Sequence, residues 1–569
     1  MKRSSLFVTL FLFMAGAEVA LVGQVPKRLP SRTLEKIPQQ MRMHVPMYSG
    51  EAAMMKATLY NVDLQGKPVF QPDGMIASQK PKKLRDVPIA DHAGPEGYAL
   101  REDNPYIAVN PVNKKFMVTV SNTFDPGNNN SNSCKAYHSS DGGVTWSPGV
   151  EMWLEWTSTD DPWFLQWLNE LCSDPVVAYS PDGGRVYIAY LDMASWYYEE
   201  SENTTYCSYY WEESSVPVMY SDDNGLNWTL LAVGLQGDRT SIEQCDNYDT
   251  GWGFYDVHHG FDYDKPWLAT SAFDPRQSNY VYLTATRFDN FYPGDIHIAF
   301  TRSSDRGATF DPPKLLESGH DPNTNVFAVV QGSRPVSGVG PGVVVAWYNS
   351  GNDGWLTGSF EIHTAYSPDH GATFKPVAVA ARDEYELSYW LGPNGSFHRW
   401  WTGMFPSIAM DGRNQLHIAY ASSPTSNWSS TEAGDIRYLS SSRAPYKNYT
   451  LPITVNRDGL LTAQGHPAIA VEKQGTVHLT WEDHRMSPKL DNTLYETYWA
   501  RKVPGATSFS KEQSVSDTPS LSSWSFIGDY TGVAVNDTTL YAVWTDRRVD
   551  STIWDYNNDV YGSRVIPKK

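Results

Sequence analysis

Short apolar segments, most of which follow a proline, recur along the chain. Each segment is rich in residues that favour strands, and a turn with Asn, Asp, Gly or Pro separates it from a second such strand. The first strands begin at Pro105, Pro175, Pro266, Pro335, Pro406, Pro467 and Tyr530. The clearest second strands are 186–190, 343–347, 416–420, 477–481 and 540–544. The pattern predicts seven strand–turn–strand repeats at intervals of about 60 to 90 residues.

A second kind of turn follows the third strand of several repeats and has the pattern S-x-D-x-G-x-[TN]-[WF]. The aspartates of its four copies are Asp141, Asp223, Asp305 and Asp369. The Asp carboxylate and the Ser hydroxyl can accept backbone N–H groups, the Gly can adopt a positive φ, and the aromatic ring can pack into the sheet. We therefore interpret these aspartates as structural clamps of tight turns, in preference to catalytic or metal-binding groups.

These four turns are Asp boxes, and with their hairpin spacing the chain resembles the Asp-box (BNR-repeat) β-propellers of the sialidase superfamily, in particular its bacterial sialidase-like group. The string Phe526-Ile-Gly-Asp-Tyr, followed by Val543-Trp-Thr-Asp-Arg, is similar to that group as well. The resemblance implies an all-β fold in which each repeat is a blade and the Asp boxes lie in outer hairpin turns. The seven first strands favour seven blades. A ring of six blades, which is usual for true sialidases, is the alternative.

The N-terminal part of the chain differs from the repeats. Residues 1–17 have the features of a signal peptide, because Lys2 and Arg3 precede a short apolar run and small residues suited to cleavage. Residues 18–102 are expected to be an extended lead-in, and residues 103–569 to form the propeller. Only three strands fit after Tyr530, and a propeller must close its ring, so we expect the lead-in to supply the missing outer strand.

Composition narrows the class of protein. The chain has 64 acidic and 45 basic side chains and a formal net charge of −19, which argues against nucleic-acid binding. Charged residues are 19% and aromatic residues 13% of the chain, which argues against global disorder. No segment reaches the roughly 20 apolar residues of a membrane-spanning helix. We expect a secreted, soluble and monomeric protein.

The four cysteines suggest disulfides, because export permits them. Cys134, Cys172, Cys207 and Cys245 allow three pairings, and we expect pairing in sequential order. The sequence contains no CxxC or CxH spacing, so the cysteines do not indicate a zinc site. We expect no metal or other cofactor, and the Asp- and Asn-rich stretch 125–130 leaves calcium as an alternative.

Propeller geometry places a functional site at the rim where first strands begin and second strands end. Candidate substrate-binding residues before the first strands are Asp174, Asp264, Arg334 and Asp529, and Asp103, Asn104 and Lys265 lie on the same rim. His466 is a candidate proton carrier, with a structural His as the alternative. Insertions rich in aromatic and acidic residues, at 153–172, 196–214, 248–263 and 389–401, should crowd this rim. Such a surface suits sugar recognition, although the rings can also simply hold the insertions against the blades.

Two second strands end in the pattern W-x-D-x-R and allow two interpretations. On the first, Asp483 pairs with Arg485 and Asp546 pairs with Arg548, as structural ion pairs on the rim. On the second, the arginines bind an anionic group and an aspartate transfers a proton. The second interpretation predicts that Arg548→Ala weakens ligand binding and leaves stability unchanged.

The resemblance also implies a test for sialidase activity. True sialidases open the first blade with an F/Y-R-I-P element whose Arg binds the sugar carboxylate, whereas this chain has Asp103-Asn-Pro-Tyr there and no such element elsewhere. This departure argues against sialic acid cleavage. We expect a glycan-acting enzyme, namely a glycoside hydrolase with two suitably spaced carboxylates. The alternative is a non-catalytic propeller that binds glycans or proteins. A surface scaffold is a third function.

Overall fold

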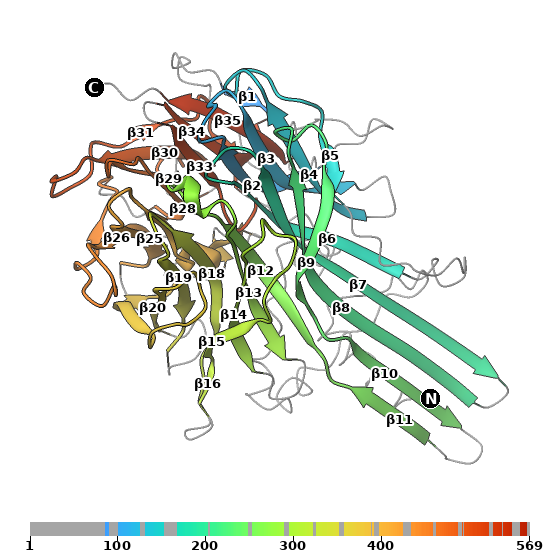
Figure 1. The fold of residues 1–569 in the computed structure, drawn as a ribbon. Coiled ribbons are helices and arrows are strands. Elements are labelled where there is room, and N and C mark those ends of the chain that lie inside the picture. Colours follow the sequence, from blue (N-terminus) through green and yellow to red (C-terminus); the bar gives the residue numbers. More distant parts are fainter. Residues whose placement is uncertain are drawn as a thin grey trace.

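The repeated strands form seven four-stranded antiparallel blades, seen in a computed structural model of the chain (Figure 1). The described residues are 86–89, 101–125, 131–152, 168–202, 205–247, 253–289, 295–321, 326–351, 358–387, 390–391, 398–424, 434–458, 462–487, 492, 494–522, 527–536, 539–548 and 558–565. The expected signal peptide, 1–17, and most of the lead-in lie outside them.

The strands of each blade follow one another from the axis of the ring outward. Blade one has β2 (Arg101–Val109), β3 (Met117–Asp125), β4 (Ser131–Ser139) and β5 (Val150–Met152). Blade two has β6 (Leu168–Tyr179), β7 (Val186–Glu202), β8 (Thr205–Ser221) and β9 (Thr229–Gln236). One parallel bridge between β4 and β6 joins blades one and two into a single sheet. Blade three has β12 (Phe261–Ala269), β13 (Val281–Asp289), β14 (Ile296–Ser303) and β15 (Lys314–Ser318). Blade four has β18 (Val330–Ser337), β19 (Val343–Asn349), β20 (Ser359–Ser367) and β21 (Ala378–Tyr385).

The remaining blades follow the same order. Blade five has β24 (Ser407–Met410), β25 (Leu416–Ser422), β26 (Asp435–Ser441) and β27 (Ile453–Thr454). Blade six has β28 (Gln464–Val471), β29 (Val477–Asp483), β30 (Leu494–Lys502) and β31 (Gln513–Ser514). Blade seven has β33 (Gly532–Asn536), β34 (Thr539–Asp546), β35 (Asp559–Val565) and β1 (Val87–Pro88). Outside the blades are β10 (Thr240–Asn247), β11 (Gly253–His258), β16 (His320–Asp321), β17 (Val326–Phe327), β22 (Trp390–Leu391), β23 (His398–Arg399), β32 (Ser520–Leu521) and the 3-10 turns η1 (Pro275–Gln277) and η2 (Trp400–Met404).

The seven blades form a closed ring. Each inner strand contacts the inner strand of the next blade, and β33 of the last blade contacts β2 of the first. No α-helix occurs in the described residues. The prediction of an all-β propeller with seven blades is therefore confirmed, and the six-bladed alternative is wrong.

The apolar core lies between neighbouring blades. One cluster joins Val176 and Tyr187 of blade two to Leu268 and Leu283 of blade three. Three tryptophans near the ends of second strands, Trp347, Trp481 and Trp544, are fully buried. Burial of a large apolar side chain contributes about 3 kcal/mol, so each blade gains its stability by stacking on the next.

The S-x-D-x-G turns connect third and fourth strands, on the rim opposite to the one where inner strands begin. Asp141 shows their geometry: its carboxylate accepts from the Thr145 backbone N–H at 3.0 Å, the Thr145 hydroxyl at 2.7 Å and the Ser139 hydroxyl at 2.9 Å. Gly143 donates to the Ser139 hydroxyl at 2.9 Å and adopts a φ of 78°, which a residue with a Cβ rarely reaches. Asp223, Asp305 and Asp369 make corresponding bonds in blades two, three and four.

Blade seven takes its outer strand from the N-terminal side of the chain. Val87 pairs with Gly562 and Pro88 with Tyr561, antiparallel to β35. Beside this pairing, Arg548 contacts Asp86, Asp517 and Asp546 at 2.6 Å each, and its guanidinium lies 4.3 Å from the Tyr561 ring centre. The side chains of Asp86 and Asp546 are fully buried. Burial and a hydrogen bond with Asp517 raise the pKa of Asp86 to about 8, so Asp86 retains a proton near neutral pH and Arg548 is the counter-charge of Asp546 and Asp517.

Both disulfides pair in the expected sequential order. Cys134–Cys172 joins β4 of blade one to β6 of blade two, and Cys207–Cys245 joins β8 to β10 outside the ring. Among the described residues, no helix has the length and apolar character to cross a membrane.

We expect Asp141→Ala to lower the free energy of unfolding by about 1–2 kcal/mol, because it leaves the Thr145 N–H and the Ser139 hydroxyl without their acceptor. Chemical denaturation measures this change. Val144→Ala is the control in the same turn, since Val144 is 54% exposed and its truncation should change stability little. Equal effects of the two substitutions would show that the turn does not depend on the carboxylate.

We expect Arg548→Gln to lower the free energy of unfolding by about 3–5 kcal/mol, because the buried carboxylate of Asp546 and the partly buried carboxylate of Asp517 lose their counter-charge. Arg276→Gln is the matched control, since Arg276 pairs with one carboxylate but is 78% exposed, and its loss should matter little. Unchanged stability in Arg548→Gln would restore the interpretation of Arg548 as a ligand-binding residue.

Candidate functional site

Four non-glycine residues immediately before inner-strand prolines have a left-handed backbone. Asn104, Asp174, Lys265 and His466 have φ values of 50°, 52°, 50° and 46°. In each of these four blades, the pairing of the first two strands shifts register at the same place. Left-handed φ values cost free energy in residues other than glycine and persist where surrounding structure imposes them. The repeat therefore imposes an unusual conformation on the residues at the start of each of these strands.

Three of these residues, Asn104, Asp174 and Lys265, meet with Asp529 at the axis of the ring. The Asn104 amide donates to the Asp174 carboxylate at 2.6 Å, and the Lys265 ammonium contacts Asp174 at 2.9 Å and also Asp529. The Asp529 backbone N–H in turn donates to the Asn104 side chain. Lys265 belongs to blade three and Asp529 precedes blade seven, which is not its neighbour, so their contact spans the axis. We call these four residues the axial cluster.

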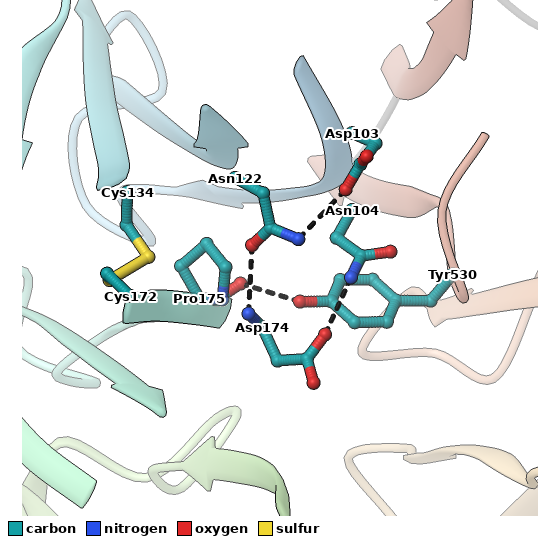
Figure 2. Close-up of a disulfide and its surroundings, with 8 residues drawn as sticks. All are labelled: Asp103, Asn104, Asn122, Cys134, Cys172, Asp174, Pro175 and Tyr530. Atoms are coloured by element: carbon teal, nitrogen blue, oxygen red, sulfur yellow. Dashed lines mark hydrogen bonds between the residues drawn. A yellow bond between two sulfur atoms is a disulfide. The ribbon is translucent and has the colours of Figure 1, made fainter. Parts of the chain in front are cut away.

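Asp103 extends the axial cluster through Asn122 of the second strand (Figure 2). The Asn122 amide donates to Asp103 at 2.8 Å, and its carbonyl oxygen accepts from the Asp174 backbone N–H at 2.8 Å. Asn122 lies directly opposite both Asp103 in β2 and Cys134 in β4, and Cys134 is bonded to Cys172 of β6, two residues before Asp174. The disulfide thus holds the inner strand of blade two against the site.

Asp103 has an unusual proton affinity. Its side chain is 1% exposed, and burial raises its pKa to about 8. The hydrogen bond from Asn122 lowers this pKa, and the negative charges of Asp529 and Asp174 raise it. Asp174, by contrast, is ion-paired with Lys265. The site therefore holds one carboxyl group that is protonated near neutral pH beside another that is paired with a cation.

Aromatic rings and one arginine adjoin the axial cluster. Tyr106, Trp267 and Tyr530 form edge-to-face contacts, with ring centres 4.9 Å apart for Tyr106 and Trp267 and 5.3 Å apart for Trp267 and Tyr530. The guanidinium of Arg334 lies 3.7 Å from the Trp267 ring centre, and it donates to the Ser407 hydroxyl at 2.9 Å. Arg334 is 7% exposed, and burial lowers its pKa to about 10.

The other candidates lie in separate contacts. His466 is 3% exposed, with Nδ1 at 2.8 Å from Glu482 and Nε2 at 2.9 Å from the Thr402 hydroxyl, so both ring nitrogens are engaged. Asp264 accepts from the Lys265 backbone N–H at 2.7 Å and from the Gln331 amide at 3.3 Å. Neither contact brings the side chain to Asp174 or Asp529.

The W-x-D-x-R segments form local ion pairs. Arg485 binds Asp483 through two bonds of 2.8 and 2.6 Å, and the Trp481 indole donates to the same carboxylate at 2.9 Å. Asp546 has the same pattern, with Trp544 donating at 2.8 Å and Arg548 at 2.6 Å. Both aspartate side chains are fully buried. These contacts favour the structural interpretation and keep Asp483 and Asp546 apart from the axial cluster.

Sequence reasoning missed Asn122 as a member of the site. Asn122 is polar and buried, and follows the apolar run that begins at Met117. A run of polar residues at the end of a second strand was the available signal, but it does not show which residue bonds across to the next blade. No group of three or more His, Cys, Asp or Glu side chains in the described part of the chain is arranged to hold a metal ion.

No known family model matches the chain, and no curated protein matches it by sequence. Solved structures resemble it in three dimensions. An α-L-arabinofuranosidase from Fusarium graminearum has 14% identity and a TM-score of 0.38, and the match covers 69% of this chain and 93% of that one. The endosialidase of phage phi92 has 10% identity and a TM-score of 0.41, covering 85% and 69% of the two chains. A polysaccharide lyase described as an ulvan lyase has 11% identity and a TM-score of 0.43, covering 84% and 95%.

We expect Lys265→Met to lower the free energy of unfolding by about 3–5 kcal/mol, because Asp174 and Asp529 then lie buried beside one another without the ammonium. Lys265→Met combined with Asp174→Asn should recover part of the loss, which denaturant unfolding of both variants measures. Lys502→Met, at a lysine on a third strand that is only partly buried, is the control and should change stability by less than about 1 kcal/mol. If the double variant lost as much free energy of unfolding as Lys265→Met alone, the broken ion pair would not be the cause.

Proposed function

We propose that the protein acts on glycans as a glycoside hydrolase, with Asp103 as proton donor and Asp174 as the second carboxylate. The observation that carries the proposal is the difference between their environments: burial raises the pKa of Asp103 to about 8, whereas Asp174 is paired with Lys265. Glycoside hydrolysis commonly uses one protonated and one ionised carboxyl group. Asn122 bonds to both residues and so fixes them relative to one another.

Each neighbour has a role in this proposal. Lys265 holds Asp174 in its ionised form, and the Asn104 amide orients the same carboxylate. The carboxylate of Asp174 activates water or attacks the sugar directly, and the separation of the two carboxyl groups in the bound complex selects between these outcomes. Tyr106, Trp267 and Tyr530 pack against one another and form an apolar wall beside these carboxyl groups. Sialic acid cleavage is not part of the proposal, because Asp103 stands where sialidases have an Arg.

Burial of the axial cluster and Asp103 limits how a substrate can reach them. Asp103 and Asp174 are at most 1% exposed, so a substrate reaches them only when segments of the rim move aside. Exclusion of water would strengthen the electrostatic interactions at the site. The same burial favours the alternative function, a non-catalytic propeller in which the axial cluster serves only to hold the blades together.

The proposed place of action is outside the cell. Two disulfides support export, because such bonds persist in oxidising compartments. Glycans are abundant there, and neither the proposed acid nor the proposed base requires a cofactor.

We expect the rate of sugar release to fall as the pH rises through about 8, because the proton donor must carry its proton. Asp103→Asn cannot donate a proton and should lower the rate by about 10²–10⁴-fold. It should also unfold at a higher temperature than the wild type at pH about 9: the folded pKa lies above the unfolded value, so the native carboxyl group costs stability as the pH rises from about 4 to 8.

The experiment is incubation with a glycan array, reading both bound protein and released sugar. Asp141→Ala, on the opposite rim, is the control and should keep the wild-type rate. Binding without sugar release would remove the hydrolase and leave the glycan-binding propeller. Full activity in Asp103→Asn would assign the proton donor to another residue.

A further inference from the structure

Arg334 of blade four carries a buried positive charge without a negative partner. Its side chain is 7% exposed, and no carboxylate of the described residues forms an ion pair with it. Burial lowers the pKa of Arg334 to about 10, so the guanidinium remains charged at neutral pH. Burying a charge that is not neutralised lowers the stability of the fold. The environment of Arg334 therefore favours an anion that the described part of the chain does not supply.

The guanidinium of Arg334 lies deeper in the ring than the axial cluster. It lies 3.7 Å from the Trp267 ring centre and donates to the Ser407 hydroxyl at 2.9 Å. Trp267 and Ser407 immediately follow the inner-strand prolines of blades three and five, whereas three members of the axial cluster immediately precede such prolines. Inner strands run inward from the rim that carries the axial cluster, so the guanidinium is one step further along them.

The polar groups around this guanidinium are donors. The Ser407 hydroxyl accepts from Arg334 and also from the Ile469 backbone N–H at 3.2 Å, so its own proton is left to donate. The Tyr106 hydroxyl lies close enough to Arg334 for each group to change the pKa of the other. It forms no hydrogen bond with a described residue. A site that combines a positive charge with free donors is complementary to an anion.

A small ligand can reach these donors. The only hydrogen bond that Arg334 makes to the described residues is the one to Ser407, so Nε and Nη2 of its guanidinium are left to donate. Within the described part of the chain, the fully buried polar atoms that lack a partner include neither these two nitrogens nor the Tyr106 hydroxyl. The three groups therefore face accessible space.

We infer that a small inorganic anion, of which chloride is the common example, binds between Arg334, Tyr106 and Ser407. The guanidinium supplies the charge, and the two hydroxyls donate to the ion. A water molecule accepts such bonds but does not neutralise the charge. An acidic sugar does not fit, because the axial cluster lies between this place and the rim. The bound anion links blades one, four and five, and this role is independent of glycan hydrolysis.

The test is thermal unfolding at constant ionic strength while sodium chloride replaces sodium gluconate, whose anion is too large to enter. The melting temperature of the wild type should rise with chloride, level off as the site saturates and gain about 2–4 °C in total. Arg334→Gln should lose this response. In gluconate, Arg334→Gln should melt no lower than the wild type, because it removes a buried charge that is not neutralised.

Two further variants and one diffraction measurement make the test specific. Tyr106→Phe keeps the ring but removes one donor, so half of the rise should require about fivefold more chloride. Arg437→Gln is the matched control: Arg437 is a half-buried arginine of blade five that pairs with Glu384 at 3.3 Å, so its loss should leave the chloride response unchanged. Crystals soaked in bromide should show anomalous scattering beside Arg334.

Equal melting temperatures of the wild type in the two salts would overturn the inference. An undiminished chloride response in Arg334→Gln, or bromide bound only elsewhere, would overturn it as well. A larger rise with sodium glucuronate than with chloride, lost in Arg334→Gln, would assign Arg334 to an acidic sugar and also overturn it. Unfolding is measured without any sugar substrate, so failure of the proposed hydrolase would leave this result unaffected.

Discussion

The structure depends on closure of the ring. A blade is apolar on both faces, and only the neighbouring blades can cover them, so an open ring would expose a whole sheet to water. Closure joins the two ends of the chain, because β1 pairs with β35 in the last blade and β33 contacts β2 of the first. Arg548 reinforces the junction by binding Asp86 beside β1 and neutralising the buried carboxylate of Asp546.

Closure also determines what happens at the axis. Seven inner strands begin on one rim, and their first residues come within hydrogen-bond distance of residues from other blades, as Lys265 and Asp529 show. Carboxylates brought together without water need a counter-charge or a proton. Lys265 supplies the charge for Asp174 and Asp529, and Asp103 retains a proton. The charge arrangement of the site is thus a consequence of the ring geometry.

The sequence predicts those features that depend on local pattern. The prolines before the first strands indicate the blades, and the Ser and Gly around Asp141 indicate a tight turn. Partners across blades are harder to predict, because they depend on register and on the curvature of the ring. Within one strand end the prediction is easier: the pairing of Asp483 with Arg485 is one of the two interpretations that the sequence allows, and the structure selects it. The pattern predicts that the aromatic insertion 196–214 lies on the rim, but not that it continues β7 and β8 and pairs with β10 and β11 in the sheet of blade two.

Two aspartates on opposite rims show how stability and chemistry are separated. Burial opposes ionisation of Asp141 slightly, yet hydrogen bonds from Thr145 and Ser139 hold its pKa at about 2, so its charge stabilises the fold at every pH above about 4. The pKa of Asp103 shifts the other way, to about 8, so at neutral pH the fold is less stable than it would be with a neutral side chain there. A turn residue is placed where its charge is satisfied. Burial raises the pKa of Asp86 at the ring junction to about 8 as well, so a raised pKa follows from burial, and what distinguishes Asp103 is its place beside the ion-paired Asp174.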